Sequence, residues 1–129
     1  MKRTPPPLTA GYALRVAPVI DDKEGKRKTR FTLETSQLFA SFVYDLSVQE
    51  RRDDNHIHFK ILGLRPPQLT MPAAGRATFE RDYDDLSGMC HVTVETIDGK
   101  TNTFKLRIGK DRISLLQSPP KKFVDLVLS

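Results

Sequence analysis

His56 and His58 stand two positions apart, the spacing with which a β-strand can present a metal-binding pair. Side chains at i and i+2 of a strand share a face, where two neutral imidazoles could hold a zinc ion with further ligands. Lys60 continues this face and would repel a cation, and a third ligand has to come from His91 or from an acid of the middle segment. The alternate positions are apolar and suited to a core: Ile57, Phe59 and Ile61. The pattern therefore favours a solvated strand face, with a metal-dependent enzyme using His56 and His58 as the second alternative function.

Cys90 and His91 resemble a nucleophile beside its base, but their adjacency argues against such a pair. Consecutive side chains of a strand point to opposite faces and cannot meet. Cys90 shares its face with Val92 and Val94, where a buried thiol is usual. The sequence contains no G-x-S-x-G, H-E-x-x-H, G-x-G-x-x-G or C-x-x-C motif. We therefore predict no catalytic residue and no cofactor.

The acidic stretch 82–88 begins like a calcium-binding loop, with aspartates at its first and third positions. Leu86 then stands where another oxygen ligand is needed, Ser87 where the loop needs glycine, and Thr93 where a bidentate acid belongs. The stretch is predicted to be an acidic turn between two strands, and no metal site is expected.

A basic turn at residues 23–30 carries four closely spaced cations: Lys26, Arg27, Lys28 and Arg30. It is not a Walker phosphate loop, because Ile20 replaces the first glycine and Arg27 replaces the hydroxyl residue after the lysine. The cations could still hold phosphates through counterion release, so an anion- or nucleic-acid-binding β-module is the first alternative function. Phe31 is expected to point inward with Leu33, which leaves no aromatic side chains for stacking bases. A solvated hairpin tip is the favoured interpretation.

The net charge of +5 is unevenly distributed along the chain. Residues 1–30 carry +5, residues 31–99 carry −5 and residues 100–129 carry +5. Nucleic-acid binders usually concentrate positive charge on one face. Here the basic ends could instead pack against the acidic middle, so the overall sign is weak evidence about partners.

The hydrophobic pattern alternates with a period of two, which is typical of strands. The polar cluster 51–55 indicates one hairpin turn. Asp98-Gly99 indicates a second one, because aspartate and glycine both tolerate the positive φ that such turns need. The expected strands cover residues 11–20, 29–35, 42–49, 56–61, 76–83, 92–94, 104–108, 112–117 and 122–128. We predict an all-β, mostly antiparallel sandwich or small barrel of about seven to nine strands.

Three segments need separate interpretation. After Ser36, a candidate N-cap, apolar residues also fall at helical spacing, so residues 36–41 could form one helical turn. The proline-containing stretch 65–75 is expected to connect two halves of one domain, because each half alone has too few strands for a core. The C-terminal segment 123–128 either pairs as the closing strand, which we favour, or docks on another chain by strand addition.

Length and composition fit one soluble domain, with 129 residues of which 38% are hydrophobic and 29% charged. We expect a flexible proline-rich leader at 1–9 and a single β domain at 10–129. Cys90 is the only cysteine and no apolar run approaches a membrane span, so a cytoplasmic location without a membrane partner is expected. We predict a binding or interaction module without chemistry of its own, whose partner is a protein or an unidentified ligand; nucleic acid is less favoured, and the oligomeric state is not predicted.

Overall fold

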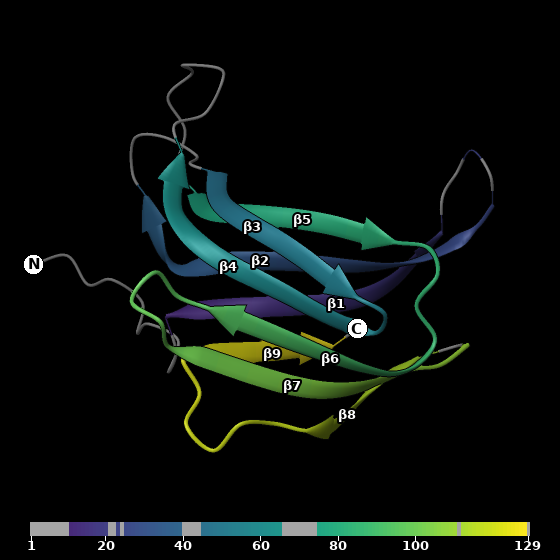
Figure 1. The fold of residues 1–129 in the computed structure, drawn as a ribbon. Helices are drawn as coiled ribbons and strands as arrows, with labels where there is room; N and C mark the ends of the chain where they lie inside the picture. The colour runs from purple at the N-terminus through teal and green to yellow at the C-terminus, as the bar shows by residue number, and fades with distance from the viewer. Residues whose placement is uncertain are drawn as a thin grey trace, which may run out of the picture.

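Nine strands make up the fold in a computed structural model that describes residues 11–20, 23, 25–39, 45–65, 75–110 and 112–128 (Figure 1). They are β1 (Tyr12–Ile20), β2 (Arg27–Phe39), β3 (Asp45–Asp53), β4 (His56–Arg65), β5 (Gly75–Tyr83), β6 (Gly88–Glu95), β7 (Thr101–Ile108), β8 (Ile113–Gln117) and β9 (Val124–Leu128). These ranges contain no helix, and so no helix with the length and apolar character to cross a membrane. The predicted all-β fold is confirmed.

The nine strands are hydrogen-bonded in one continuous order, and this sheet bends so that its two parts pack against each other as two layers. Its order is β8-β7-β6-β4-β3-β5-β2-β1-β9, and β3 is joined to β5 only through the pair Asp45 and Thr78. The layers separate at this weak junction into a front sheet of five strands (β8, β7, β6, β4, β3) and a rear sheet of four (β5, β2, β1, β9). Because β8 and β9 do not pair with each other, the fold is a sandwich and not a closed barrel.

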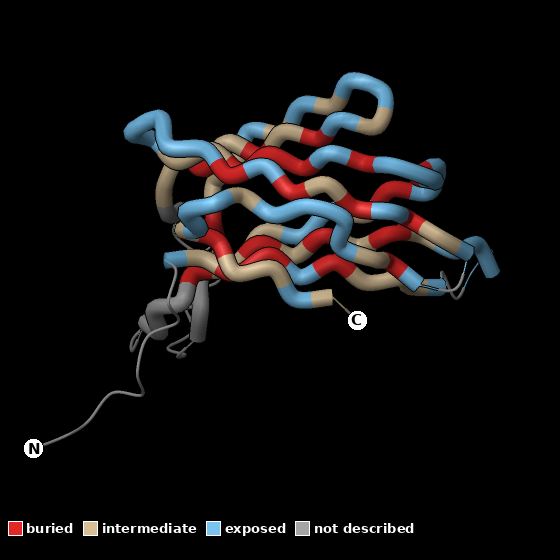
Figure 2. The backbone as a smooth tube through the Cα atoms, turned by 90° about the horizontal axis from the view of Figure 1, so that it is seen from below, coloured by how far each residue is buried: buried red, intermediate tan, exposed pale blue. Residues whose placement is uncertain are grey.

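The core forms where alternate side chains of the two sheets meet, so buried and exposed positions alternate along the strands in Figure 2. Phe59 of β4 lies 5.9 Å from Phe31 of β2 and 5.6 Å from Phe79 of β5, measured between ring centroids. These three rings join the layers. Other side chains buried completely in the core are Leu14, Val16, Leu33, Ile57, Val92, Val94, Phe104, Leu106 and Val124. Removing this apolar surface from water is the main stabilising contribution.

The β3–β4 hairpin turns more tightly than the sequence predicts. Only Asp54 and Asn55 separate the two strands, where a turn over 51–55 was predicted. Asp54 adopts a φ of 53°, as two-residue hairpin turns require. The amide nitrogen of the Asn55 side chain donates to the carbonyl oxygens of Ser87 and Met89, at 3.0 Å each. The hairpin tip is thereby fixed against the start of β6.

The helical alternative for 36–41 is wrong over residues 36–39, because β2 continues through them as a strand. Pairing with β5 extends to the contact of Leu38 with Arg76 and of Phe39 with Gly75, after a register shift that follows Glu34. Long-range pairing outweighs the local helical spacing here. Residues 40–44, the expected leader 1–9 and all but the ends of the connection 65–75 lie outside the described residues.

The C-terminal segment forms β9, which pairs in parallel with β1 at the edge of the rear sheet. The prediction that this segment joins the sheet is confirmed. Asn102 of β7, only 2% exposed, holds the chain where it enters β9. Its Oδ1 accepts from the backbone N–H groups of Phe123 and Val124, at 2.8 and 3.2 Å, and its Nδ2 donates to the Lys121 carbonyl oxygen at 2.9 Å. One buried amide of the front sheet thus anchors a strand of the rear sheet.

Candidate functional site

The outer surface of β3, β4, β6 and β7, called the front face from here on, carries all three histidines of the sequence. Strands β4 and β6 run parallel, and their register places three pairs side by side: His56 and His91, His58 and Thr93, and Lys60 and Glu95. The inward positions of β4 are buried: Ile57, Phe59 and Ile61. The prediction that the histidines occupy the outer face of this strand is confirmed.

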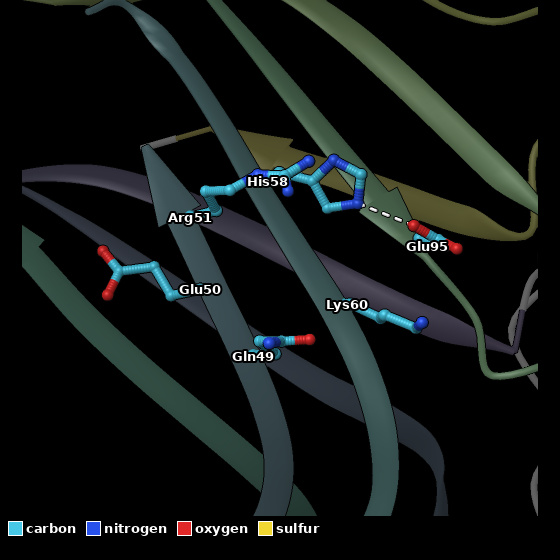
Figure 3. A pocket seen from close by; sticks show the side chains of 6 residues that line it. All are labelled: Gln49, Glu50, Arg51, His58, Lys60 and Glu95. Atoms are coloured by element: carbon cyan, nitrogen blue, oxygen red, sulfur yellow. Dashed lines mark hydrogen bonds and ion pairs between the residues drawn. The ribbon is translucent and has the colours of Figure 1, made fainter. Parts of the chain in front are cut away.

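Both histidines of β4 are hydrogen-bonded to side chains of β6. His56 Nε2 lies 3.0 Å from Thr93 Oγ1, which lies 2.9 Å from Thr103 Oγ1 on β7. His58 Nε2 lies 2.8 Å from a carboxylate oxygen of Glu95 (Figure 3). The side chains of His58 and Glu95 are each 24% exposed. The sheet therefore holds these imidazoles in place, which the sequence did not predict.

The same contacts argue against the metal site that the histidine pair suggests. The two Nε2 atoms already face a hydroxyl group and a carboxylate group on β6. His91 is the neighbour of His56 on β6, and the two ring centroids are 6.0 Å apart. Throughout the described ranges, no group of three or more His, Cys, Asp or Glu side chains is arranged to hold a metal ion. The described geometry gives the metal-dependent alternative no support.

Four cationic side chains surround the histidines on the front face: Arg51, Lys60, Lys105 and Arg107. Within the part of the chain that the structure describes, none of the four forms an ion pair. The carboxylates described at outward positions of these strands are Asp53 and Glu95, and Glu95 is already bonded to His58. Glu50 also borders this face, but it accepts hydrogen bonds from Arg81 and Tyr83. The front face therefore has an excess of positive charge.

Two neighbouring hollows on the front face share Arg51 and His58 as lining residues. The first, of about 330 Å³, is lined by Gln49, Glu50, Arg51, His58, Lys60 and Glu95 (Figure 3). The second, of about 440 Å³, is lined by Arg51, Arg52, Asp53, His56 and His58. Register places Arg51 opposite His58 and Gln49 opposite Lys60, so N–H donors from two strands gather around the first hollow. The two acids of this lining, Glu50 and Glu95, are bonded to Arg81 and His58, so the donors of Arg51 and Lys60 are the groups that complement a carboxylate or other anion.

On the outer surface of the rear sheet, by contrast, cations and acids pair across strands. Arg30 of β2 donates two hydrogen bonds to the Asp82 carboxylate of β5, at 2.9 and 3.0 Å, and its Nε lies 3.6 Å from Glu80. Arg15 of β1 lies 3.1 Å from Glu34 of β2. Hydrogen bonding to the Arg30 guanidinium group lowers the pKa of the Asp82 carboxyl group. The basic N-terminal part of the chain is thus partly neutralised by acids of the middle segment.

The four residues proposed from the sequence as an anion-binding cluster do not form one site. Strand alternation places Lys28 and Arg30 on the outer surface of the rear sheet, where Arg30 is bonded to Asp82. Lys26 is exposed beside the hairpin tip. Arg27 instead lines a third hollow, of about 250 Å³, at the end of the sandwich. The structure therefore singles out Arg27 from this cluster.

Cys90 and His91 occupy opposite sides of β6, as predicted. Cys90 is completely buried, whereas His91 is exposed on the front face. Burial raises the pKa of the Cys90 thiol to about 11. Because the thiolate is the reactive form, this environment suits a structural cysteine and not a nucleophile.

The acidic turn occupies residues 84–87, between β5 and β6. Asp85 accepts a hydrogen bond of 2.6 Å from Arg52 at the end of β3, and this guanidinium group lowers the pKa of the Asp85 carboxyl group. Tyr83, at the end of β5, donates to the Glu50 carboxylate, which also accepts from Arg81 at 3.0 Å. These polar contacts close the seam where the front and rear sheets separate.

The chain matches no protein-family model, no curated protein and no solved structure. A functional interpretation therefore depends on the geometry and charge of the described residues. By these criteria the front face is the leading candidate site.

Proposed function

We propose that the protein is a small binding module whose front face holds an acidic segment of a partner protein. The observation that carries the proposal is the group of cations around the histidines, which form no ion pair among the described residues: Arg51, Lys60, Lys105 and Arg107. The rear surface, built from the same kind of strands, pairs Arg15 and Arg30 with acids of neighbouring strands. A concentration of one charge sign is expected where a partner supplies the opposite sign.

An acidic protein segment fits this surface better than nucleic acid does. The outward positions described on β3, β4, β6 and β7 contain no Phe, Tyr or Trp side chain on which a base could stack, and the imidazoles of His56 and His58 are hydrogen-bonded to β6. They do contain arginine and lysine donors, which bind carboxylates well. The hollows beside Arg51 and His58 offer room for carboxylate side chains to reach these donors.

The proposal requires no chemistry from the protein itself. The thiol of Cys90 is buried, and both histidines of β4 are hydrogen-bonded within the sheet. These features support binding in preference to catalysis. We place the module in the cytoplasm, since a free cysteine is compatible with a reducing compartment.

Two triple variants that lose the same charge test the proposal. R51Q/K60Q/K105Q removes three cations of the front face, whereas R112Q/K121Q/K122Q removes three exposed cations elsewhere. Labelled poly-L-glutamate is the probe, with binding followed by fluorescence anisotropy at two salt concentrations. We expect the front-face variant to bind at least about tenfold more weakly, or about 1.4 kcal/mol, and the control to change less than about twofold. Equal losses would overturn the choice of surface, and tighter binding of a single-stranded oligonucleotide would overturn the choice of partner.

A further inference from the structure

We propose that β8 accepts an extended segment of a partner protein as one further strand of the front sheet, and that this segment has an apolar centre and acidic ends. β8 is the last strand of the front sheet, and among the described strands it pairs with β7 alone (Figure 1). This edge of the sheet is distinct from the outer surface that carries the histidines. Its role is therefore independent of the function proposed above.

The backbone of Leu115 faces the open edge of the sheet. A hydrogen bond of 2.9 Å from the Gly109 N–H group to the Arg112 carbonyl oxygen closes the hairpin between β7 and β8. Bonded and non-bonded pairs alternate along an antiparallel ladder from such a closing pair. Ser114 is therefore in a pair bonded to β7, and Leu115 is in the next, non-bonded pair. The N–H and carbonyl groups of Leu115 thus point away from β7, where an added strand can bind them.

β8 also leaves apolar surface uncovered at this edge. Leu115 pairs with Leu106, whose side chain is completely buried on the inward side of the front sheet. Leu115 is nevertheless 44% exposed and Leu116 is 43% exposed, because no described strand lies on the other side of β8. An apolar side chain of an added strand would cover Leu115 as its cross-strand neighbour. The centre of the partner segment is therefore apolar.

The two edges of the folded sheet differ in their protection against such pairing. β8 contains no Asp, Glu, Lys or Arg in its five residues. β9, the strand at the other edge, carries Asp125. Charged residues on an edge strand discourage the addition of another chain. β8 is therefore the edge that is suited to accept a strand.

Cations at both ends of β8 define the ends of the partner segment. Lys110 and Arg112 precede the strand, Lys121 and Lys122 follow it, and all four are exposed. Within the described chain none of the four forms an ion pair. In the sequence, residues 109–122 hold these four cations against one acid, Asp111. Acidic groups at both ends of the added strand would complement them.

The same cations argue against a second copy of this chain as the occupant. Arg112 lies beside Gly109 after the end of β7, whereas the Lys121 carbonyl oxygen is bonded to Asn102 near the start of β7. The cations therefore lie toward opposite ends of β8. Two copies related by a twofold axis would pair their β8 strands in antiparallel orientation, so each basic end would meet a basic end. A separate partner with acidic ends avoids this repulsion.

The probe is a nine-residue peptide in which two glutamates flank each end of a Val-Thr-Val-Thr-Val centre. We expect saturable binding to the full-length, ¹⁵N-labelled protein, with the largest amide shifts at Leu115 and Leu116. Hydrogen exchange of the Leu115 amide should slow at least about tenfold in the complex, whereas that of Ser114, which is already bonded to β7, should change less than about twofold. An unchanged exchange rate at Leu115, or shifts centred on the outer front face, would overturn the proposal.

Two peptides that are N-methylated at alternate positions separate strand addition from attraction between charges. Each one loses the backbone donors of one edge but keeps its charge. One of the two should bind at least about tenfold more weakly, and the other should bind like the parent peptide. Equal affinities of the two peptides would exclude strand addition. Because this test uses the unchanged protein, it does not depend on the folding of a variant.

Substitution of an exposed leucine by lysine supplies a signed test. Leu115→Lys adds a cation beside an acidic peptide, so contact through charge alone would become tighter. Strand addition instead needs the apolar neighbour, so the peptide should bind at least about fivefold more weakly. Leu62→Lys, at a leucine of β4 that is 42% exposed, is the matched control and should not weaken binding. The amide spectrum verifies folding, and tighter binding to folded Leu115→Lys would overturn the proposal.

The charge variants distinguish this edge from the front face. R112Q/K121Q/K122Q should bind the peptide at least about fivefold more weakly, whereas R51Q/K60Q/K105Q should change its affinity less than about twofold. Poly-L-glutamate lacks the apolar centre, so the first variant keeps its affinity for that polymer. Sedimentation of the parent protein without peptide should show a monomer. A dimer that Leu115→Lys converts into a monomer would show that the edge binds a second copy, and would overturn the proposal.

Discussion

The two outer surfaces of the sandwich use the same strand alternation but arrange their charges differently. On the rear surface Arg30 is bonded to Asp82, and Arg15 to Glu34. On the front face Lys60 and Lys105 lie near the histidines without an ion pair among the described residues. The alternation of side chains along a strand therefore does not distinguish a surface that only stabilises the fold from a candidate binding surface. The pairing of charges across neighbouring strands distinguishes the two surfaces here.

The acids on the two surfaces also differ in what they neutralise. Glu95 on the front face is bonded to a histidine and leaves the nearby Lys60 unpaired in the described structure. Asp82 on the rear surface is bonded to an arginine in a two-point contact. The front-face contact orients an imidazole, whereas the rear contact cancels a full charge. This difference supports the proposal that the front face binds an acidic partner.

The largest expected effect concerns the two faces of β4 itself. Phe59→Ala removes a completely buried ring that contacts Phe31 and Phe79 of the other sheet, so it should lower the free energy of unfolding by about 3–5 kcal/mol. Phe104→Ala on β7 should lower it by a similar amount. Urea titrations followed by circular dichroism provide the measurement. Losses below about 1 kcal/mol would mean that the inward and outward faces have been exchanged.

Much of this inward and outward assignment was predictable from the sequence. The period-two pattern correctly placed Phe31, Leu33 and Phe59 inside and His58 outside, because alternation is a local property of a strand. Applied to the basic turn, the same rule separates Arg27 from Lys28, although the two were grouped as one candidate anion site.

Pairing between distant strands was not predictable in the same way. Thr93 lies 37 positions from its partner His56, and Asp82 lies 52 positions from Arg30. Periodicity reports which face a residue occupies but not which strand lies beside it. The parallel pairing of β4 with β6 passes over β5 in the chain, so the network of the front face becomes visible only in three dimensions.

The next effect is kinetic and compares neighbouring residues on opposite sides of β6. Cys90 is completely buried with a thiol pKa of about 11, so it should react with Ellman's reagent at pH 8 at least about 100-fold more slowly than the thiol in the urea-unfolded chain. His91 is exposed and should be modified readily by diethyl pyrocarbonate in the folded protein. Rapid thiol reaction in the folded state would show that β6 opens locally or is misassigned.

A smaller effect is expected for the charge pairing of the rear surface. Arg30→Gln removes the two-point contact to Asp82, but both side chains are partly exposed, at 40% and 30%, so the loss should be at most about 1 kcal/mol. Lys60→Gln on the front face removes an equal charge with no ion pair described for it. The difference between the two denaturation midpoints is the measurement, and a larger loss for Lys60→Gln contradicts the comparison.

Acid should weaken the rear pair in a predictable direction. The pKa of Asp82 is lowered in the folded protein, so the folded state binds this proton less tightly than the unfolded chain does. The contribution of Asp82 is therefore complete above about pH 5 and is lost as the pH falls through the folded-state pKa. Unfolding free energies of the parent and of Asp82→Asn, measured in urea, should converge between about pH 5 and pH 2. A difference that widens toward low pH would contradict this assignment.

The smallest expected effect is on the front face, where His58→Ala should change the free energy of unfolding by no more than about 0.5 kcal/mol. The imidazole loses its contact with Glu95, but that carboxylate is partly exposed and can be hydrated instead. A surface residue that serves binding should contribute little to the free energy of unfolding and more to the affinity for the partner. The same variant should therefore weaken poly-L-glutamate binding measurably. If His58→Ala costs more than about 1 kcal/mol and leaves binding unchanged, the hydrogen-bonded histidines serve the fold. The front face would then be a second supporting surface, and its excess charge would need another explanation.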